Sequence, residues 1–448
     1  MWRKLASQSL AIFGGRLLGA AVVFAVQALI ARRWGAHVLG DYLVAVAAIN
    51  IGAMVMPLGF QTVGAYFAAE YRAHEAGPSL RAFMRQAYGQ ATLAALGVAL
   101  VGAAAFHVLR PSGPLAALAP PALVMAAATA LVYLNGALLV GLKRPVTGLI
   151  ADTLCRPMLA LSGFLLAATV YSGATPLVPM LWWMALGYVA VAAAQGLAVL
   201  VTVRTIPATA MAARDDESRR WWRFALPWAV ISLVTDFFFD IDLVVLTHML
   251  GRDDLAVFGI CARIYALLAF GVATIYTVTM PDILEAGARR NDVEFHRRIG
   301  DANLMATLLA TVMAAAMFAI GPFLGLLFGH AFSSGAGPLG IMALGLVARA
   351  ALGPASLVLS YHDRPYASLT AAAVALVGLL VGNLALVPHF GLAGAAVAAL
   401  VATTAWSVAL WVTARHHVHI DVSIVPRLKD LLVGQRAAQG RARRSATE

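Results

Sequence analysis

The amino-acid sequence predicts an all-α polytopic membrane protein with about twelve transmembrane helices. Hydrophobic residues make up 61% of the chain and charged residues only 12%, whereas a soluble domain contains roughly 25% charged residues. The apolar residues gather in runs of about 20, the length that an α-helix needs to cross roughly 30 Å of hydrocarbon. These runs are continuously apolar rather than alternating, which favours helices over the strands of a barrel.

Twelve runs of this kind can be placed along the chain, separated by short polar connections. They cover residues 9–31, 43–67, 86–109, 118–141, 147–171, 179–203, 224–247, 257–281, 300–328, 338–361, 367–387 and 393–414. The first run follows Met1-Trp2-Arg3-Lys4 and so imitates a secretory signal peptide. Arg16 interrupts it and no convincing cleavage site follows, so we expect an uncleaved first span.

Two short patterns recur in the same order in the two halves of the chain. Residues 34–42 and 250–258 place a glycine, a leucine and an aromatic residue at the same relative positions, and residues 142–145 and 362–365 both end in Arg-Pro. The separation is nearly the same for both pairs, which indicates a duplicated unit. Six spans is an even number, so both halves start from the same side of the membrane. We therefore expect a parallel repeat with a pseudo-twofold axis along the membrane normal.

This repeat sets the expected domain organisation. We expect an N-terminal lobe over residues 1–203, a cytoplasmic connection over 204–223 and a C-terminal lobe over 224–414. A basic tail, 415–448, follows, and its composition predicts that its end is disordered.

The positive charges are distributed unevenly between the two sides of the predicted membrane protein. Most of the 32 lysines and arginines fall in one set of alternate connections, and the opposite set holds only Arg32, Arg33, Arg110 and Arg252. Positive residues collect on the cytoplasmic side of bacterial inner-membrane proteins. We therefore expect both termini to be cytoplasmic, and the net charge of +11 gives no reason to expect a nucleic-acid partner.

Several kinds of chemistry find no motif in this sequence. It contains no G-x-x-x-x-G-K-[ST] loop for nucleotide phosphates, no His-Glu-x-x-His metal motif and no G-x-S-x-G nucleophile turn. Its two cysteines, Cys155 and Cys261, lie in apolar runs without a Cys or His at metal-ligand spacing. We therefore expect neither a cofactor nor a metal site, and a transporter rather than an enzyme.

Charged residues inside the predicted spans are the main candidate functional residues, because each costs several kcal/mol unless it is paired or hydrated. Arg16, Arg263 and Arg349 lie within the first, eighth and tenth runs. If they line a shared cavity they would bind an anion, since guanidinium groups match phosphate oxygens in a bidentate manner. Arg16 can instead extend to the cytoplasmic headgroups.

The acids in the spans suggest charge pairs or a coupling site. Asp152 and Arg156 are four residues apart on one helix face and can neutralise each other. Asp240 or Asp242 can pair with Arg263, and Asp236 shares a helix face with Asp240. Two nearby carboxylates disfavour joint ionisation, so one of that pair could carry a proton.

The sequence resembles polysaccharide-export flippases of the multidrug/oligosaccharidyl-lipid/polysaccharide (MOP) exporter superfamily over about residues 10–414. The resemblance lies in Arg16-Leu17-Leu18-Gly19, Ala31-Arg32-Arg33-Trp34-Gly35 with Leu39-Gly40-Asp41-Tyr42, Leu250-Gly251 with Arg263, and Gly391-Leu392-Ala393-Gly394. It implies two six-helix lobes around a central cavity, as in multidrug and toxin exporters (MATE), that alternate between inward-open and outward-open states.

The same resemblance implies a cargo and a cellular setting. The cargo would be an oligosaccharide on undecaprenyl pyrophosphate, destined for O-antigen, capsule or exopolysaccharide, and carried across the bacterial inner membrane by a monomer. A polymerase and glycosyltransferases would act beside it. Relatives that flip the peptidoglycan precursor hold pyrophosphate with cavity arginines, and Arg16 and Arg263 look like counterparts of two of them, whereas Arg349 matches no motif. Polar residues at membrane depth would contact the sugars: Gln61, Tyr66, Asn135, Tyr265 or Tyr276.

Other functions stay open at this point. A cation-coupled MATE-type multidrug exporter would use Asp236 and Asp240, although an arginine in the first span disfavours organic cations. A lipid II flippase is a further possibility, but such relatives usually have spans beyond the twelfth. A membrane polymerase or ligase would need a large periplasmic loop, and the longest one expected here has about ten residues. Nothing in the sequence favours a receptor or scaffold.

Overall fold

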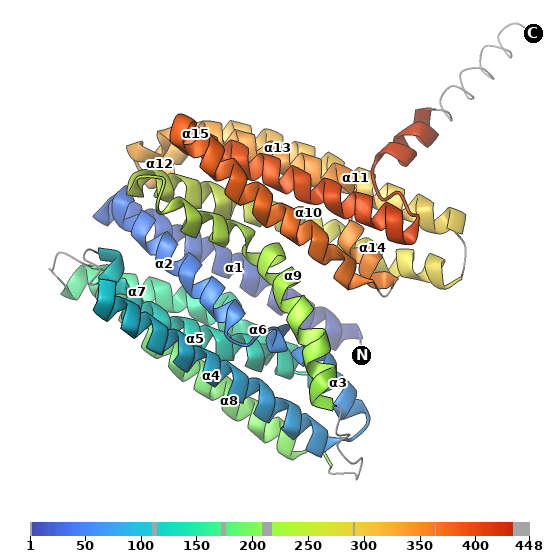
Figure 1. The fold of residues 1–448 in the computed structure, drawn as a ribbon, viewed down its shortest axis with the longest axis horizontal. Helices are drawn as coiled ribbons and strands as arrows, with labels where there is room; N and C mark the ends of the chain where they lie inside the picture. The colour runs from blue at the N-terminus through green and yellow to red at the C-terminus, as the bar shows by residue number, and fades with distance from the viewer. Residues whose placement is uncertain are drawn as a thin grey trace, which may run out of the picture. The chain divides into compact units, whose positions relative to one another are not determined.

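The computed structural model describes residues 2–109, 114–171, 176–207, 217–289, 292–362 and 364–432, and the regular structure in these ranges is entirely helical (Figure 1). The elements in chain order are α1 (Trp2–Trp34), α2 (Ala36–Val55), α3 (Phe60–Ala73), α4 (Gly77–Leu109), α5 (Pro114–Gly141), α6 (Pro145–Ile150), the π turn η1 (Ala151–Cys155), α7 (Arg156–Val170), α8 (Leu177–Arg204), α9 (Glu217–Leu246), α10 (Arg252–Ala288), α11 (Asp292–Ile320), the 3₁₀ turn η2 (Gly321–Phe323), α12 (Leu324–Phe328), the 3₁₀ turn η3 (His330–Gly335), α13 (Ala336–Leu352), α14 (Ala355–Tyr361), the 3₁₀ turn η4 (Pro365–Ala367) and α15 (Ser368–Val418).

The expected all-α polytopic class is confirmed. Within the described residues, ten helical segments are long and apolar enough to cross a membrane. The difference from twelve has two sources. The runs 367–387 and 393–414 both lie in α15, which counts once although its backbone bends at Gly391 (φ 53°, ψ −131°). The run 224–247 corresponds to α9, which contains three aspartates and is not among the ten.

The chain forms two compact units. The first contains Met1–Ala256 with Leu327–Ala331, and the second contains Val257–Leu326 with Phe332–Glu448. By its contacts α9 belongs to the first unit, where it packs against α2 and α3. The lobe boundary expected at 204–223 was placed from the sequence repeat, not from contacts, and stays a prediction. Residues 208–216 of that connection lie outside the described ranges.

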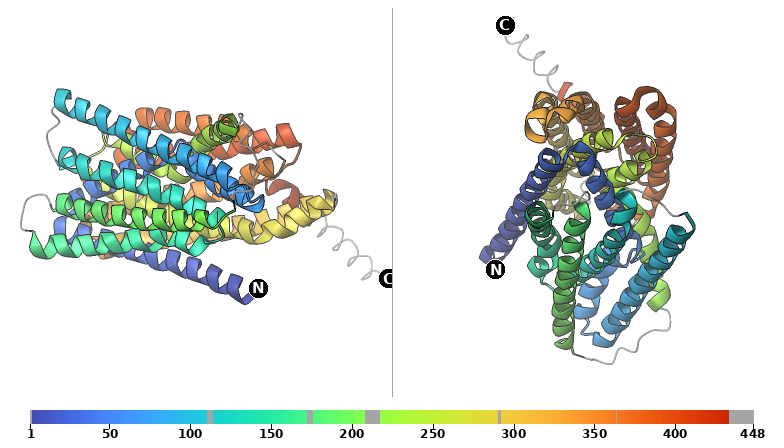
Figure 2. Two further views of the ribbon diagram at one scale, coloured as in Figure 1. Left: turned by 90° about the horizontal axis from the view of Figure 1, so that it is seen from below. Right: turned by 90° about the vertical axis from the view of Figure 1, so that its left-hand side faces the viewer.

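In the first unit α5 is the central helix. It packs against α2, α3 and α8, and Figure 2 shows α5 and α8 lying alongside each other. At one end of the unit an aromatic cluster that includes Phe60, Phe67, Phe83 and Trp221 is buried where α3, α4 and α9 meet. This cluster fixes the entry of α9 into the unit.

The second expected span, 43–67, differs from the observed structure at both ends of α2. The helix already begins at Ala36, because Asp41, which suggested a polar connection, is buried and paired with Arg252. It ends at Val55, and the chain turns before α3. Gly59 permits this turn, since its φ of 88° favours glycine and a Cβ would lie 1.9 Å from the carbonyl oxygen of Ala225.

In the second unit α13 packs against both α11 and α15. Small residues line these helices, including the buried Ala302, Ala306 and Ala310 of α11. Membrane helices approach closely through such small residues, because lipid tails provide no hydrophobic driving force for packing.

Candidate functional site

A network of polar side chains centred on Arg156 lies inside the first unit. The guanidinium of Arg156 donates a hydrogen bond to Oδ1 of Asn50 (2.7 Å) and lies 3.6 Å from Oδ1 of Asp152. Asn50 in turn donates to Oδ2 of Asp240 (3.1 Å), and the Tyr188 hydroxyl donates to Asp152 (3.4 Å). Arg156 is therefore in direct contact with the carboxylate of Asp152, and the carboxamide of Asn50 joins it to the carboxylate of Asp240. We call these five residues the Arg156 network.

The network is assembled from four parts of the chain that are distant in sequence. Asn50 comes from α2, Asp152 from the π turn, Tyr188 from α8 and Asp240 from α9. The Arg156 side chain is 16% exposed, whereas that of Asp152 is 45% exposed. The expected i, i+4 pair of Asp152 and Arg156 is therefore present, but it is part of a larger arrangement.

The π turn explains how Arg156 reaches this position. The Arg156 amide donates to the carbonyl of Ala151, five residues earlier, so the turn contains one residue more than an α-helical turn. Pro157 follows and has no amide hydrogen, so the Thr153 carbonyl lacks its usual helical donor. That carbonyl lies against Gly19 of α1, where a Cβ would come within 1.9 Å of its oxygen.

On the α9 side, the helix is interrupted between two of its aspartates. Phe237 has non-helical backbone angles (φ −122°, ψ 20°). Asp236 before the interruption is exposed, whereas Asp240 and Asp242 after it are buried. The expectation that Asp236 and Asp240 share one helix face assumes an uninterrupted helix, and the break removes that basis. Asp240 accepts a hydrogen bond from Asn50 of α2.

The three sequence-predicted arginines belong to different units. Arg16 is exposed on α1 of the first unit, whereas Arg263 on α10 and Arg349 on α13 are half-buried in the second. A shared anion cavity lined by all three stays a prediction.

Arg349 has the most distinctive surroundings of the three. Its guanidinium stacks over the Trp406 ring, 4.9 Å from the centroid, and lies close to the hydroxyls of Tyr265 and Tyr276. The Tyr276 hydroxyl donates to Oδ1 of Asn303 (2.8 Å). None of the ion pairs found in the described ranges involves Arg349. Its neighbours are a neutral indole and neutral phenols, so its charge is available to an anion.

Two of the residues proposed to contact sugars make hydrogen bonds within the protein, and their contact with sugars stays a prediction. Gln61 donates to the Met54 carbonyl (3.1 Å), and Asn135 donates to the Ala192 carbonyl (3.0 Å) while accepting from Tyr88. Asn50 and Tyr188 were missed by the sequence analysis. Asn50 is a carboxamide inside an apolar run, and such groups usually hydrogen-bond across helices in membranes, which is the signal that could have identified it.

The described residues contain no group of three or more His, Cys, Asp or Glu side chains placed to hold a metal ion. Cys155 and Cys261 are both free thiols.

Comparison of the sequence with models of protein families found no match, and comparison with curated protein sequences found none either. Solved structures, in contrast, match over nearly the whole chain. An inward-facing multidrug resistance MATE family transporter of the MOP superfamily is 13% identical, with a TM-score of 0.72 over 90% of this chain and 94% of its own. The lipid II flippase MurJ in an inward closed conformation is 13% identical, with a TM-score of 0.71 over 92% of this chain and 87% of its own.

A third similar structure is a MOP superfamily transporter from Pyrococcus furiosus, described as having a binding pocket of reverse polarity that suggests a different function. It is 14% identical and has a TM-score of 0.57 over 93% of this chain and 94% of its own. These similarities define the fold as that of MOP-superfamily transporters, and with the ten apolar helices they define a multi-pass membrane protein.

Proposed function

We propose that the protein is a flippase that moves an oligosaccharide linked to undecaprenyl pyrophosphate across the bacterial inner membrane by alternating access. The observation that carries this proposal is the Arg349 site: an arginine within a membrane-spanning helix whose described neighbours are aromatic and neutral. A fixed positive charge at membrane depth is costly unless it serves an anion, so it marks a candidate anion site.

The geometry of this site suits a phosphate group. A guanidinium can stack on an aromatic face while the edge bearing its N–H donors stays available, and that edge matches two phosphate oxygens at once. Because the surroundings are apolar, the attraction between cation and phosphate is stronger than in water. The Tyr276 phenol beside it donates its hydrogen to Oδ1 of Asn303, so its oxygen is suited to accept a hydrogen bond from a sugar hydroxyl.

The sign of the charge distinguishes this cargo from that of a drug exporter. An organic cation would be repelled by Arg349, whereas a pyrophosphate-linked lipid would be attracted to it. The lipid tail can stay in the bilayer while the charged head crosses, so arginines need only lower the cost for the head. Arg16 and Arg263 stay candidate pyrophosphate-binding residues.

A second candidate, a cation-coupled MATE-type exporter, is favoured by Asp236. This aspartate is exposed beside the break in α9, and an exposed carboxylate at an interrupted helix suits an organic cation or a coupling ion.

The test is the pool of lipid-linked oligosaccharide in a deletion strain, measured together with surface polysaccharide. We expect the completed undecaprenyl-linked unit to accumulate on the cytoplasmic side and the surface polymer to be lost. The wild-type gene should restore the polymer, Arg349→Ala should restore less than a tenth of it, and Arg349→Lys should restore an intermediate amount because it keeps charge but loses the planar fork.

Arg289→Ala is the matched control, since Arg289 is exposed and its ion pair in the described residues is with Glu285, one turn earlier. It should restore the polymer fully at equal expression. Full restoration by Arg349→Ala would contradict the assigned site. An unchanged lipid-linked pool with new sensitivity to cationic dyes would instead favour the exporter and place Asp236 at its site.

A further inference from the structure

The chain continues in an ordered path after α15. The helix ends at Val418, and His419 takes up a left-handed conformation (φ 59°) that turns the backbone. Oδ1 of Asp421 then accepts three hydrogen bonds: from Nε1 of Trp411 (2.8 Å) and from the amide (3.0 Å) and hydroxyl (2.7 Å) of Ser423. The Ser423 hydroxyl accepts from the Val425 amide (3.4 Å), and a final helix covers residues 425–432 (Figure 1).

Residues 420–424, which we call the strap, are built into the break between α13 and α14. The Val422 carbonyl accepts from Nδ2 of Asn303 (3.0 Å), and the Ile424 amide donates to the Ala351 carbonyl (2.9 Å). Gly353 has a φ of 83°, and a Cβ there would lie 2.0 Å from the Val422 oxygen. The strap therefore passes so close to this break that only a glycine fits.

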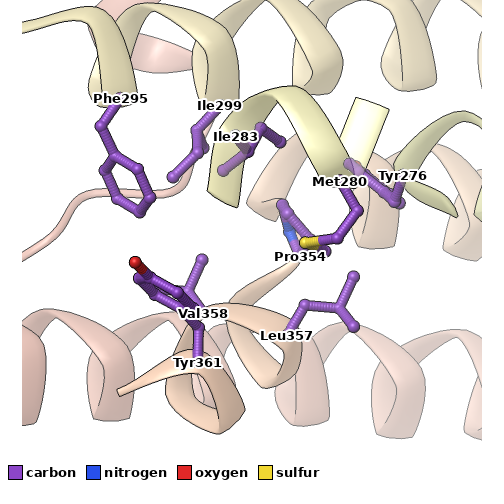
Figure 3. A pocket seen from close by; sticks show the side chains of 9 residues that line it. All are labelled: Tyr276, Met280, Ile283, Phe295, Ile299, Pro354, Leu357, Val358 and Tyr361. Carbon is purple, nitrogen blue, oxygen red and sulfur yellow. The ribbon is translucent and has the colours of Figure 1, made fainter. Parts of the chain in front are cut away.

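The strap also completes an apolar cluster. Ile420 and Val422 are buried with Phe295 and Val358. Phe295 and Val358 also line a small pocket between the ends of α10, α11 and α14 (Figure 3). Because the strap is anchored by backbone hydrogen bonds and by this cluster, it holds the final helix in a fixed orientation.

The final helix is attached along one side only. Arg427 pairs with Asp301 of α11 (2.6 Å), and its alkyl chain packs over Gly300. Four apolar side chains of this helix are exposed: Val425 (48%), Leu428 (41%), Leu431 (40%) and Leu432 (57%). At about 100° per residue these four fall within about 120° of the helix surface, and Asp430 lies about 160° around the helix from Leu428.

The basic residues on and near this helix indicate what its apolar face contacts. Lys429 is exposed at the edge of the apolar face, and the last turn of α15 contains Arg415, His416 and His417. The sequence that follows, residues 433–448, has four arginines and a single acid, Glu448. An apolar stripe flanked by basic residues, directly after a membrane-spanning helix, is the pattern of a helix that lies in the membrane–water interface.

We propose that the helix 425–432 is a peripheral membrane helix that inserts Val425, Leu428 and Leu432 at the acyl–headgroup boundary and binds anionic phospholipid headgroups through Lys429. The strap fixes its depth relative to the break between α13 and α14. The inference does not depend on the cargo that the protein carries.

The test uses the full-length protein with Cys155→Ser and Cys261→Ser, labelled with an environment-sensitive dye at Leu428→Cys or, as the matched control, at Asp430→Cys. Both positions are exposed, and the labelled proteins are reconstituted in phosphatidylcholine vesicles with or without phosphatidylglycerol. With phosphatidylglycerol we expect a doxyl-lipid to quench the label at position 428 several-fold more than the label at 430. Lys429→Glu or high salt should weaken this difference.

Three results would overturn the proposal. Equal quenching at positions 428 and 430 would show that the apolar face has no special contact with lipid. Equal quenching at 428 with and without phosphatidylglycerol would remove the role of anionic lipid. Shielding of position 428 from a soluble quencher without any lipid quenching would assign the face to a protein partner or a second copy of the chain.

Discussion

The backbone carbonyl of Arg252 lies against Gly40, so that a Cβ on Gly40 would come within 2.2 Å of its oxygen. The guanidinium of Arg252 pairs with the next residue, Asp41 (3.4 Å), which is 4% exposed. These residues belong to segments 34–42 and 250–258, the same pair that the sequence repeat relates. The two equivalent segments therefore meet in the first unit, where α2 supports the first turn of α10.

We expect Gly40→Ala to destabilise the protein by about 1–3 kcal/mol, the usual cost of overpacking a closely packed site. The obstacle is a backbone atom, which cannot move aside as a side chain could. Thermal unfolding of the purified protein measures the effect. Gly97→Ala is the control: nothing lies within 4 Å of a Cβ there, and alanine gains about 1 kcal/mol in helix propensity. Equal melting temperatures for the two variants would contradict the close contact.

Gly19→Ala should disturb the crossing of α1 with the π turn. The added methyl group would meet the Thr153 carbonyl oxygen at 1.9 Å, so we expect a cost similar to that at Gly40, about 1–3 kcal/mol. Gly14→Ala, in the same helix, has open space around its Cβ and should leave the melting temperature unchanged or raise it. If the two substitutions had the same effect, the crossing would not depend on Gly19.

The sequence predicted the fold class and the Asp152–Arg156 pair, because hydropathy and i, i+4 spacing are local properties. It predicted twelve spans where ten helical segments of the described residues qualify. It did not predict Asn50 as the residue that joins Arg156 to Asp240. Those partners are 106 and 190 residues away in the chain, and a single carboxamide in an apolar run does not indicate which helix it faces. A contact of this kind depends on packing that no local pattern encodes.

Proline marks only some of the interruptions between helices. Pro57 and Pro354 lie where α2 gives way to α3 and α13 to α14. Pro227 lies inside α9, well before the interruption of that helix, and Pro281 lies inside α10. The interruption at Phe237 occurs in an aromatic stretch without proline or glycine, so propensity gave no signal. The strained backbone at Phe237 is held by tertiary contacts such as the hydrogen bond from Asn50 to Asp240. Such contacts exist only in the folded protein.

We expect Arg156→Met to destabilise the protein by about 3 kcal/mol, the lower end of the range for breaking a buried ion pair, because Asp152 is partly exposed. Stability is lost because the polar groups of Asn50, Asp152 and Asp240 would stay inside the protein without the positive charge that compensates them. Arg156→Lys should lose less, since it keeps the charge, although one ammonium cannot reproduce both contacts of the guanidinium.

The double variant Arg156→Met with Asp152→Asn provides the check on this interpretation. Removing the opposite charge should recover part of the lost stability, measured as a positive interaction in a double-mutant cycle of melting temperatures. Strict additivity of the two substitutions would mean that Arg156 stabilises the protein without coupling to Asp152.

Asp421 should make the strap sensitive to acid. Burial disfavours the charged form of this carboxylate, but hydrogen bonds from Trp411 and Ser423 outweigh burial, and with Arg415 nearby the pKa lies below its usual value. A lowered pKa in the folded state contributes stability above the pKa of the unfolded chain, and that stability is lost as the pH falls through the folded value. We therefore expect the strap to loosen only below about pH 4, the ordinary aspartate range.

The label at Leu428→Cys reports this change when the pH is lowered from 7 to 3. The signal should stay constant down to roughly pH 4 and then change. In an Asp421→Asn background it should already be altered at pH 7 and show no further transition that can be assigned to this carboxylate. A transition of the same size in both proteins would assign the acid sensitivity to another group.

The π turn takes up one extra residue without turning the helical segments on either side of it, because a turn closed by an i to i−5 hydrogen bond holds one residue more than an α-helical turn. Deleting one residue from 151–155 would let the segment wind as ordinary α-helix, with α6 and α7 keeping nearly their present faces. The face carrying Ala160, Phe164 and Ala167 would stay buried, whereas the widened turn that carries Asp152 and the Thr153 carbonyl would be lost. A single-codon deletion here would thus act on the charge network and on the contact with Gly19 while sparing the packing of the rest of α7.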